Sequence, residues 1–292
     1  MSTEVYYFSG TGNSLFVARQ IVERINGTLI SIPSIIEKEH IRTEADVVGI
    51  VFPVYYATND CGIPLIISRF VRKLESLNSK YIFAACTCGR MPGTTLENLS
   101  KLIASTGGTL AAGFVMKMND ETLSKEKQDK MLAEQKEKLD AVCKYVLARK
   151  KGKLETRGIF RKIVLAPVLY LAIKPLFSRR YRKLSDSAGL PFDELIPLAD
   201  RSFQVDAKCN GCGICAQVCP ANNIRLVDRK PVWQHHCETC FACHSWCPQS
   251  AIFGEIVSYN QRYHHPSVKL SDMLMAKTIS NRSYDPFAFS QQ

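Results

Sequence analysis

The chain has no run of apolar residues long enough to cross a lipid bilayer, which takes about 20 residues in a helix. One apolar segment, residues 163–173, is shorter than this, contains Pro167 and has basic residues on both sides. The chain also begins without the basic, apolar and small-residue regions of a secretory leader. We therefore expect a cytoplasmic protein with no transmembrane span.

Acidic residues are scarce relative to basic ones, with 27 Asp and Glu against 38 Lys and Arg, for a formal net charge of +11. Hydrophobic residues make up 46% of the chain, which excludes wholesale disorder. The excess of basic residues fits a basic surface, or binding of nucleic acid, anionic lipid or an acidic protein. Only the charge favours nucleic acid, so we expect no nucleic-acid partner.

Short apolar runs alternate with longer amphipathic segments over the first 150 residues, which is typical of a parallel α/β fold. A helix over residues 124–151 should end this unit, with Leu132, Leu139, Val142 and Val146 on its buried face. The predicted strands are Val5–Phe8, Thr28–Ile32, Val47–Phe52, Tyr81–Ala85 and Thr109–Met118.

The composition predicts three regions, because 292 residues exceed one typical domain of about 150 residues. Residues 1–151 form the α/β domain, residues 152–200 a basic and apolar helical connector, and residues 201–292 a cysteine-rich domain with a C-terminal extension. We expect the connector to pack between the domains. The alternative is that residues 157–183 dock on a membrane surface or on an acidic partner.

A glycine-rich loop follows the first predicted strand and resembles a phosphate-binding loop. A dinucleotide fingerprint needs a third glycine where Leu15 stands, and a P-loop needs a lysine that is missing here. A loop of hydroxyl groups and glycines at a helix N-terminus can still bind a terminal monophosphate through backbone N–H groups. The candidate residues are Ser9, Gly10, Thr11, Gly12, Asn13 and Ser14.

This loop resembles the FMN-phosphate loop of flavodoxins, and the order of strands and helices is similar to theirs. The resemblance implies a doubly wound, five-stranded parallel sheet that binds FMN. It also implies two loops around the flavin ring, although Cys86-Thr87-Cys88 stands where small flavodoxins have an aromatic residue. The matching residues are Pro53, Tyr55, Tyr56 and Ala57 in one loop and Thr87, Cys88 and Gly89 in the other.

Two cysteine runs give the strongest signal in the sequence. Both read C-x2-C-x2-C-x3-C-P, the spacing of bacterial ferredoxins, in which the fourth cysteine ligates the other cluster. Zinc prefers paired C-x2-C sets and fits this longer run less well. We expect one [4Fe–4S] cluster on Cys209, Cys212, Cys215 and Cys247, and a second on Cys237, Cys240, Cys243 and Cys219.

The remaining cysteines are expected to be small buried hydrophobic residues rather than ligands. They are Cys61, Cys86, Cys88 and Cys143. The histidines among the second run are expected to support the sites or to lie at the surface, because sulfur already completes both ligand sets. They are His235, His236 and His244.

The whole chain resembles the flavodoxin–ferredoxin fusion proteins of the EFR type, called "ferrodoxins", over both domains. This resemblance implies a small α+β ferredoxin-like domain and electron transfer between two clusters and FMN. FMN holds one or two electrons and a cluster passes one, so a protein with both cofactors would convert between one-electron and two-electron transfer. A redox protein partner is expected. The alternative is a ferredoxin-linked flavin reductase that acts on a small molecule.

Overall fold

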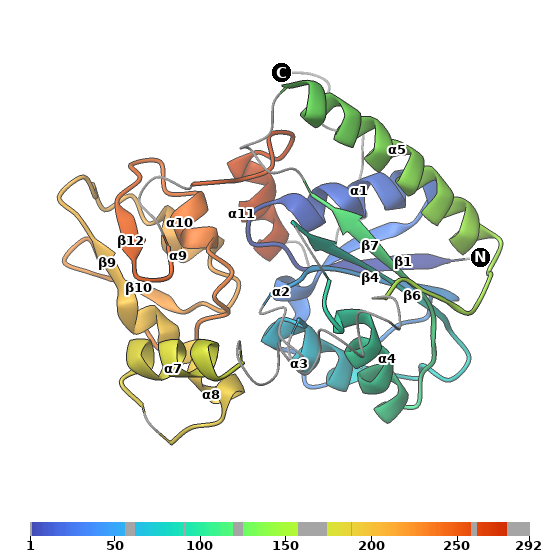
Figure 1. The fold of residues 1–292 in the computed structure, drawn as a ribbon, viewed down its shortest axis with the longest axis horizontal. Helices are drawn as coiled ribbons and strands as arrows, with labels where there is room; N and C mark the ends of the chain where they lie inside the picture. Colours follow the sequence, from blue (N-terminus) through green and yellow to red (C-terminus); the bar gives the residue numbers. More distant parts are fainter. Residues whose placement is uncertain are drawn as a thin grey trace.

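A parallel sheet with helices on both faces lies beside a smaller lobe that carries both cysteine runs (Figure 1). The computed structural model describes residues 2–55, 62–89, 92–118, 125–156, 174–187, 189–257 and 262–278. Part of the expected flavin-ring loop, including Tyr56 and Ala57, lies outside the described residues, as do residues 157–173 of the connector, which include its apolar segment 163–173.

The main sheet has the strand order β2-β1-β4-β6-β7-β8, and all of its neighbouring strands are parallel. Its strands are β1 (Thr3–Tyr7), β2 (Thr28–Ser31), β4 (Val47–Pro53), β6 (Tyr81–Cys88), β7 (Leu110–Lys117) and β8 (Lys153–Leu154). The five longer strands, counted along the chain, have the order 2-1-3-4-5 of a flavodoxin-like sheet. The predicted fold is therefore confirmed, with the two-residue β8 as an additional edge strand.

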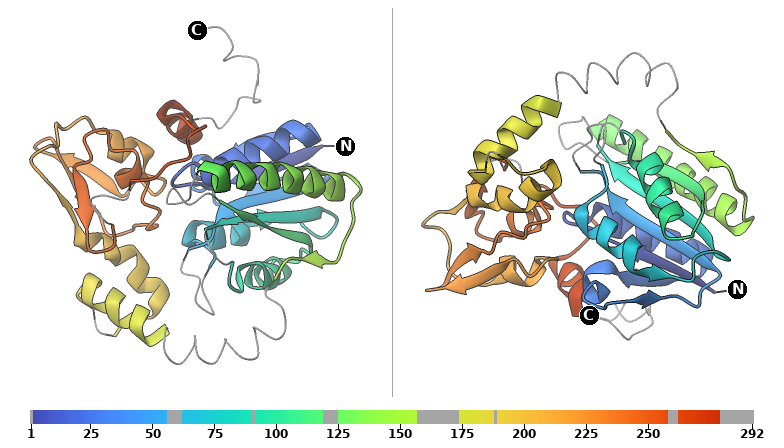
Figure 2. Two further views of the ribbon diagram at one scale, coloured as in Figure 1. Left: turned by 45° about the horizontal axis from the view of Figure 1, so that its top comes forward. Right: turned by 90° about the horizontal axis from the view of Figure 1, so that it is seen from below.

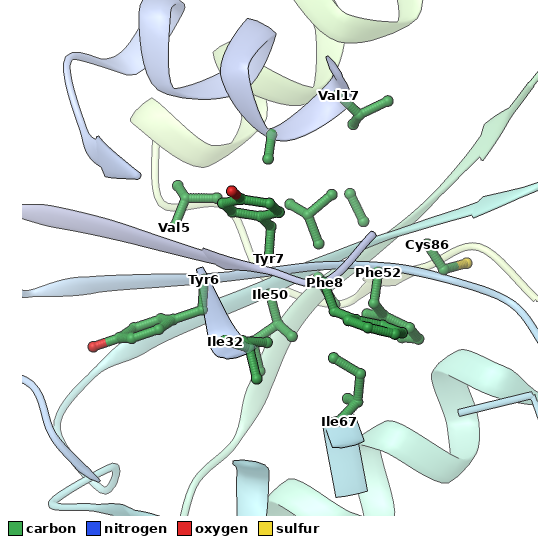
Figure 3. Packing of buried hydrophobic residues seen from close by; sticks show 14 of the residues in the cluster. Val5, Tyr6, Tyr7, Phe8, Val17, Ile32, Ile50, Phe52, Ile67 and Cys86 are labelled. Atoms are coloured by element: carbon green, nitrogen blue, oxygen red, sulfur yellow. The ribbon is translucent and has the colours of Figure 1, made fainter. Parts of the chain in front are cut away.

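The central strands are buried on both faces, which explains why they are almost continuously apolar. Along β1, Val5 and Tyr7 point to one side of the sheet and Tyr6 points to the other (Figure 3). Phe8, just beyond the strand, packs near Phe52 on the second side. This alternation gives each sheet face its own apolar layer beneath the helices.

Helices cover both faces of the sheet (Figures 1 and 2). Helices α1 (Asn13–Ile25) and α5 (Lys125–Leu147) lie on one face, and α3 (Leu65–Lys73) and α4 (Thr95–Ser105) on the other. A short helix, α2 (Ile32–Ile35), follows β2. Two further short strands, β3 (Ile41–Arg42) and β5 (Leu74–Glu75), form a separate parallel pair.

Helix α5 confirms three of the four predicted buried residues. Leu139, Val142 and Val146 are buried, whereas Leu132 is 46% exposed, so its placement on the buried face was wrong. The side chain of Gln135 donates a 2.6 Å hydrogen bond to the carbonyl of Lys117, the last residue of β7. Leu132 lies upstream of this point, where the helix has passed the end of the strand and has no sheet beneath it.

The smaller lobe combines antiparallel strand pairs with short helices, as expected for a small α+β domain. One pair is β9 (Phe203–Val205) with β12 (Ile252–Gly254), and the other is β10 (Ile224–Val227) with β11 (Lys230–Trp233). Helix α9 (Ile214–Val218) lies within the first cysteine run, and helix α10 (Ala242–Ser245) lies within the second.

The lobe continues at both ends into helices that pack against other parts of the molecule. Helices α7 (Lys174–Ser185) and α8 (Phe192–Leu198) contact each other and the 3₁₀ helix Ala199–Ser202. Helix α11 (Leu270–Thr278) lies between the lobe and the sheet domain, against α2 and α9 (Figure 1). Among the described residues, no helix has the length and apolar character needed to cross a membrane.

Candidate functional site

The loop Ser9–Ser14 joins β1 to α1 at the carboxyl end of the sheet. Gly12 precedes α1 with a φ of 92°, in the left-handed region that favours glycine. The hydroxyl of Ser9 accepts a 3.0 Å hydrogen bond from the N–H group of Gly12, which holds the turn. The N–H groups of the first helical turn have no acceptor within their own helix, so they can bind a phosphate dianion.

Hydrogen bonds connect this loop to the two other segments that were expected around the flavin. The buried hydroxyl of Ser14 lies 2.8 Å from the hydroxyl of Thr87 at the end of β6. The N–H group of Val54, just after β4, donates a 2.8 Å bond to the carbonyl of Thr87. The structure thus brings the described parts of all three predicted loops to one edge of the sheet.

Tyr55 lies between the sheet and the second cysteine run. Its ring meets that of Phe8 edge-on, with 6.1 Å between the centroids. Burial raises the pKa of its hydroxyl well above the usual value, and the neighbouring Cys240, Glu238 and Cys237 raise it further. This segment of the expected flavin site therefore also faces cysteines of the smaller lobe.

The first expected cluster set lines one pocket. Cys209, Cys212, Cys215 and Cys247 all contribute to its wall. Burial raises the pKa of the Cys215 thiol to about 11, with further increases from Cys247, Cys212 and Cys209. The sulfur of Cys247 accepts a 3.4 Å hydrogen bond from the N–H group of Ala251. Such bonds stabilise the negative charge of a bound cluster.

The cysteines of the second expected set are buried close together. Burial is the largest cause of the raised pKa of Cys240 and Cys243, and Cys219 raises the pKa of both. The sulfur of Cys237 accepts a 3.2 Å hydrogen bond from the N–H group of Thr239, and that of Cys219 a 3.3 Å bond from Asn223. Cys219 thus lies among the cysteines of the other run, as crossed ligation requires.

The two cysteine runs follow the same backbone path. Each has left-handed residues two and four positions after its first cysteine and three positions after its fourth cysteine. The equivalent pairs are Gly211 (φ 75°) and Thr239 (47°), Gly213 (76°) and Phe241 (59°), and Asn222 (52°) and Ser250 (52°). The smaller lobe therefore contains two equivalent half-sites, although only the first run uses glycine at these positions.

The histidines of this lobe make hydrogen bonds to the structure around the cysteines. Nδ1 of His235 lies 2.7 Å from a carboxylate oxygen of Asp200, and Nδ1 of His244 lies 2.8 Å from the carbonyl oxygen of Ile252. The buried Asp200 also accepts a 2.7 Å bond from the amide of Asn223. No sequence motif pointed to Asp200. In the described part of the chain, no three His, Cys, Asp or Glu side chains form a site for a single metal ion.

Three of the four other cysteines are buried in the sheet domain, as expected. Burial raises the pKa of the Cys88 and Cys143 thiols to about 11, and it also raises the pKa of Cys86. These thiols are therefore neutral near pH 7 and act as small apolar side chains. Cys61 lies outside the described residues.

The phosphate loop contacts the second cysteine run directly. A methyl group at Gly10 would overlap the backbone carbonyl of Cys240, so the two backbones touch at this point. The indole N–H group of Trp246 donates a 2.9 Å hydrogen bond to the carbonyl of Gly10. This contact between residues far apart in the sequence had no signal in the sequence.

A C-terminal strap, residues 262–278, crosses from the smaller lobe to the phosphate loop. The hydroxyl of Tyr263 donates a 2.8 Å bond to the side-chain oxygen of Asn13, and the N–H group of His265 donates a 2.8 Å bond to the carbonyl of Thr11. These bonds use oxygen acceptors of the loop and none of its backbone N–H groups. The strap is therefore compatible with phosphate binding.

Glu238, beside the first cysteine of the second run, joins the lobe to α3. Its buried carboxylate accepts a 2.9 Å bond from the N–H group of Ile66 and forms a 2.5 Å ion pair with Arg69. Burial raises the pKa of this carboxyl, while Arg69 and the bond from Ile66 lower it in part. Helix α3 has no acidic residue in its own first turn, and the carboxylate of Glu238 provides a negative charge at its N-terminus.

Comparison with known protein families places the cysteine runs in a recognised type of domain. The family model of the 4Fe-4S dicluster domain, Fer4_10, matches residues 202–248. The match includes both cysteine runs and ends at the proline that follows the second. No curated protein matches the sequence.

Several solved structures are similar to about half of the chain. A flavodoxin of Streptococcus pneumonia TIGR4 is 15% identical with a TM-score of 0.32, covering 49% of this chain and 99% of its own. Megasphaera elsdenii flavodoxin is 19% identical with a TM-score of 0.33, covering 49% and 98%. The rubredoxin oxygen:oxidoreductase of Desulfovibrio gigas is 13% identical with a TM-score of 0.31, covering 50% and 37%.

The strand order of the sheet and the family match together define the class of protein. The chain joins a flavodoxin-like α/β domain to a 4Fe–4S dicluster domain. The matched domain supports a protein that binds 4Fe–4S clusters and takes part in electron transfer.

Proposed function

We propose that the chain is a cytoplasmic electron-transfer protein of the EFR type, in which two [4Fe–4S] clusters exchange electrons with FMN. The equivalent backbone of the two runs and the N–H groups that point at their sulfurs support two clusters. The outer cluster would bind Cys209, Cys212, Cys215 and Cys247, and the inner cluster Cys219, Cys237, Cys240 and Cys243.

The loop geometry supports FMN at the edge of the sheet. Its phosphate would bind to Ser9–Ser14, where backbone donors of the first helical turn are available. When bound, FMN would supply a group that accepts one or two electrons, whereas each cluster passes one. The ring would be held by Pro53, Tyr55, Tyr56 and Ala57 on one side and Thr87, Cys88 and Gly89 on the other.

The observation that carries this proposal is the contact between the phosphate loop and the second cysteine run. The backbone of Gly10 touches that of Cys240, and Trp246 bonds to Gly10. Tyr55 also lies near Cys240. A flavin held by these loops and a cluster held by this run would therefore be neighbours, as internal electron transfer requires.

The first experiment is a count of cofactors on protein purified without oxygen. We expect about eight irons, eight sulfides and one FMN per chain, with low-temperature EPR signals from two reduced clusters. Eight irons without FMN, even after reconstitution with FMN, would overturn the flavin part of the proposal. Four irons would overturn the second cluster.

A second experiment tests transfer inside the molecule. Reduction of the clusters should be followed by reduction of the flavin in the same sample, at a rate independent of protein concentration. A flavin that stays oxidised beside fully reduced clusters would contradict the proposal. Turnover assays with quinones, nitro compounds and NAD(P)H would show whether the flavin also acts on a small molecule.

A further inference from the structure

The β10–β11 hairpin has an outward face on which apolar and basic side chains alternate. Strand pairing places Arg225 opposite Val232 and Val227 opposite Lys230. Because side chains alternate along a strand, these four residues share one face, which we call the hairpin face. Val227 and Val232 are 54% and 41% exposed, and both basic residues are exposed as well.

The charge around the hairpin face is positive. The turn between the strands adds Arg229 and Asp228, which cancel, so Arg225 and Lys230 set the sign. The ammonium of Lys230 donates a 3.0 Å bond to the carbonyl of Cys209, and the guanidinium of Arg229 a 2.9 Å bond to that of Asn210. Both acceptors are neutral carbonyls, so the bond to Cys209 does not neutralise the charge of Lys230.

The same hairpin forms part of the wall around the outer set of cysteines. Leu226 and Pro231 line the pocket together with Cys209 and Cys212. Cys212 is exposed, whereas the cysteines of the second run are buried, and Cys240 faces the sheet domain. Figure 1 shows the hairpin on the side of the lobe that lies away from the sheet. Leu226 and Pro231 belong to the opposite face of the hairpin, so the hairpin face and the outer set of cysteines lie on either side of the same two strands.

We propose that the hairpin face is the docking surface for a small acidic protein that carries one electron at a time. This inference rests on the cluster assignment in the proposed function. Val227 and Val232 would exclude water at the centre of the contact, and Arg225 and Lys230 would attract carboxylates of the partner. One electron would pass from the reduced cofactor of the partner to the oxidised outer cluster, with no proton transferred and no bond formed.

The test uses a photoreduced, small acidic [2Fe–2S] ferredoxin as the probe and measures the rate at which the clusters bleach. We expect the second-order rate constant of the wild-type holoprotein to fall as ionic strength rises. At low ionic strength, Arg225→Glu should be slower by about 10-fold or more, because charge steering changes association rates on this scale. Lys101→Glu, an exposed residue of α4 with the same change in charge, is the matched control.

A second variant tests the apolar part of the surface. Val227→Ser with Val232→Ser should slow the reaction several-fold, because it removes the apolar centre of the contact. The effect should be the same at every ionic strength, because the charge is unchanged. The proposal is overturned if Arg225→Glu matches the wild type at low salt, or if Lys101→Glu is slowed equally.

Cofactor counts separate failure of this inference from failure of the proposed function. If the variants hold the same iron and the wild type holds no FMN, a slow Arg225→Glu reaction still supports docking at the hairpin face. If iron and FMN are complete and dithionite reduces both, an unchanged Arg225→Glu rate rejects the docking surface alone.

Discussion

Gly10 is one of the residues at which the sheet domain and the smaller lobe touch. Its backbone does not need glycine for a left-handed conformation, because it is absent from the residues with positive φ. Glycine is needed because any side chain would overlap the carbonyl of Cys240. A close approach of two backbones, rather than a turn, therefore explains this residue.

The variant Gly10→Ala should force the phosphate loop and the second cysteine run apart. We expect the free energy of unfolding to fall by about 1–3 kcal/mol, the usual cost of overpacking, with less bound FMN and less iron. Denaturant unfolding and cofactor counts measure this. Gly189→Ala is the control, because no heavy atom lies within 4 Å of its added methyl group. Equal stability of the two variants would contradict the contact.

His265 should make the stability of the protein depend on pH. Burial, followed by the charge of His264, lowers the pKa of His265 to about 4. Its ring stacks on Phe16 at 4.1 Å, and its Nδ1 accepts a bond from the N–H group of Ser267. The unfolded chain, with a histidine pKa of about 6.5, binds more protons between these values. The contribution of neutral His265 to the free energy of unfolding is therefore complete above pH 6.5 and is lost as the pH falls toward 4.

The matched variant is His265→Asn, which keeps an acceptor for Ser267 but does not titrate. Between pH 7.5 and pH 5.5, its free energy of unfolding should fall less than that of the wild type. Urea unfolding without oxygen at both pH values measures this difference. Parallel pH profiles would show that His265 does not cause the dependence.

At the scale of elements, the N-terminus of α3 is completed by a residue of the other lobe. Pro64 precedes the helix, no side chain of the preceding residue caps it, and its first turn has no acidic residue. Glu238 provides the missing acceptor and negative charge from a position 172 residues away from Ile66. The helix therefore depends on the smaller lobe for its start.

Removing the charge of Glu238 should weaken this junction. We expect Glu238→Gln to lower the free energy of unfolding by about 1.5–3 kcal/mol, the range for hydrogen bonds to charged groups in buried positions. Glu75→Gln, which breaks the exposed pair with Arg42, should have no measurable effect. Denaturant titration compares them, and equal losses would mean that the junction adds nothing.

Local patterns in the sequence predicted most elements but not their mutual contacts. Apolar runs located the five long strands, whereas β8 has only two residues, too few for a pattern, and pairs with a strand far away in the sequence. Gly211 and Gly213 hold two left-handed positions of the first run, whereas Thr239 and Phe241 hold the equivalent positions of the second run, where the sequence has no glycine.

The same limit applies to the candidate site. Spacing identified the cysteine runs and the phosphate loop as candidates, because each is a local motif. The contact of Gly10 with Cys240 and the bond from Ile66 to Glu238 depend on how two separately folded regions pack. No periodicity or composition near these residues reports such packing.

At the scale of the whole molecule, the strap and Trp246 hold the lobe against the sheet domain. The Trp246 ring stacks on that of His264 at 4.4 Å while its N–H group bonds to Gly10. Helix α11 adds a 2.9 Å ion pair between Asp272 and Arg19 of α1. These contacts fix the inner cysteines in a position between the outer pocket and the phosphate loop.

The variant Trp246→Phe keeps a stacking ring and removes the bond to Gly10. We expect unchanged iron, a loss of about 1 kcal/mol in the free energy of unfolding, and several-fold slower electron transfer from the clusters to the flavin. Rapid-mixing absorbance measures the rate, and the wild type with equal cofactor content is the reference. An unchanged transfer rate would mean that this bond does not set the spacing.

The contact of Gly10 with Cys240 also has a consequence for how the protein is damaged. One backbone junction belongs to both candidate sites, so if the inner cluster strengthens FMN binding by some factor, FMN must strengthen cluster binding by the same factor. Oxygen that destroys the inner cluster would then weaken the binding of the flavin too. Free flavin is fluorescent, so an increase in the flavin fluorescence of the solution would report the loss of the iron–sulfur cluster, which does not fluoresce.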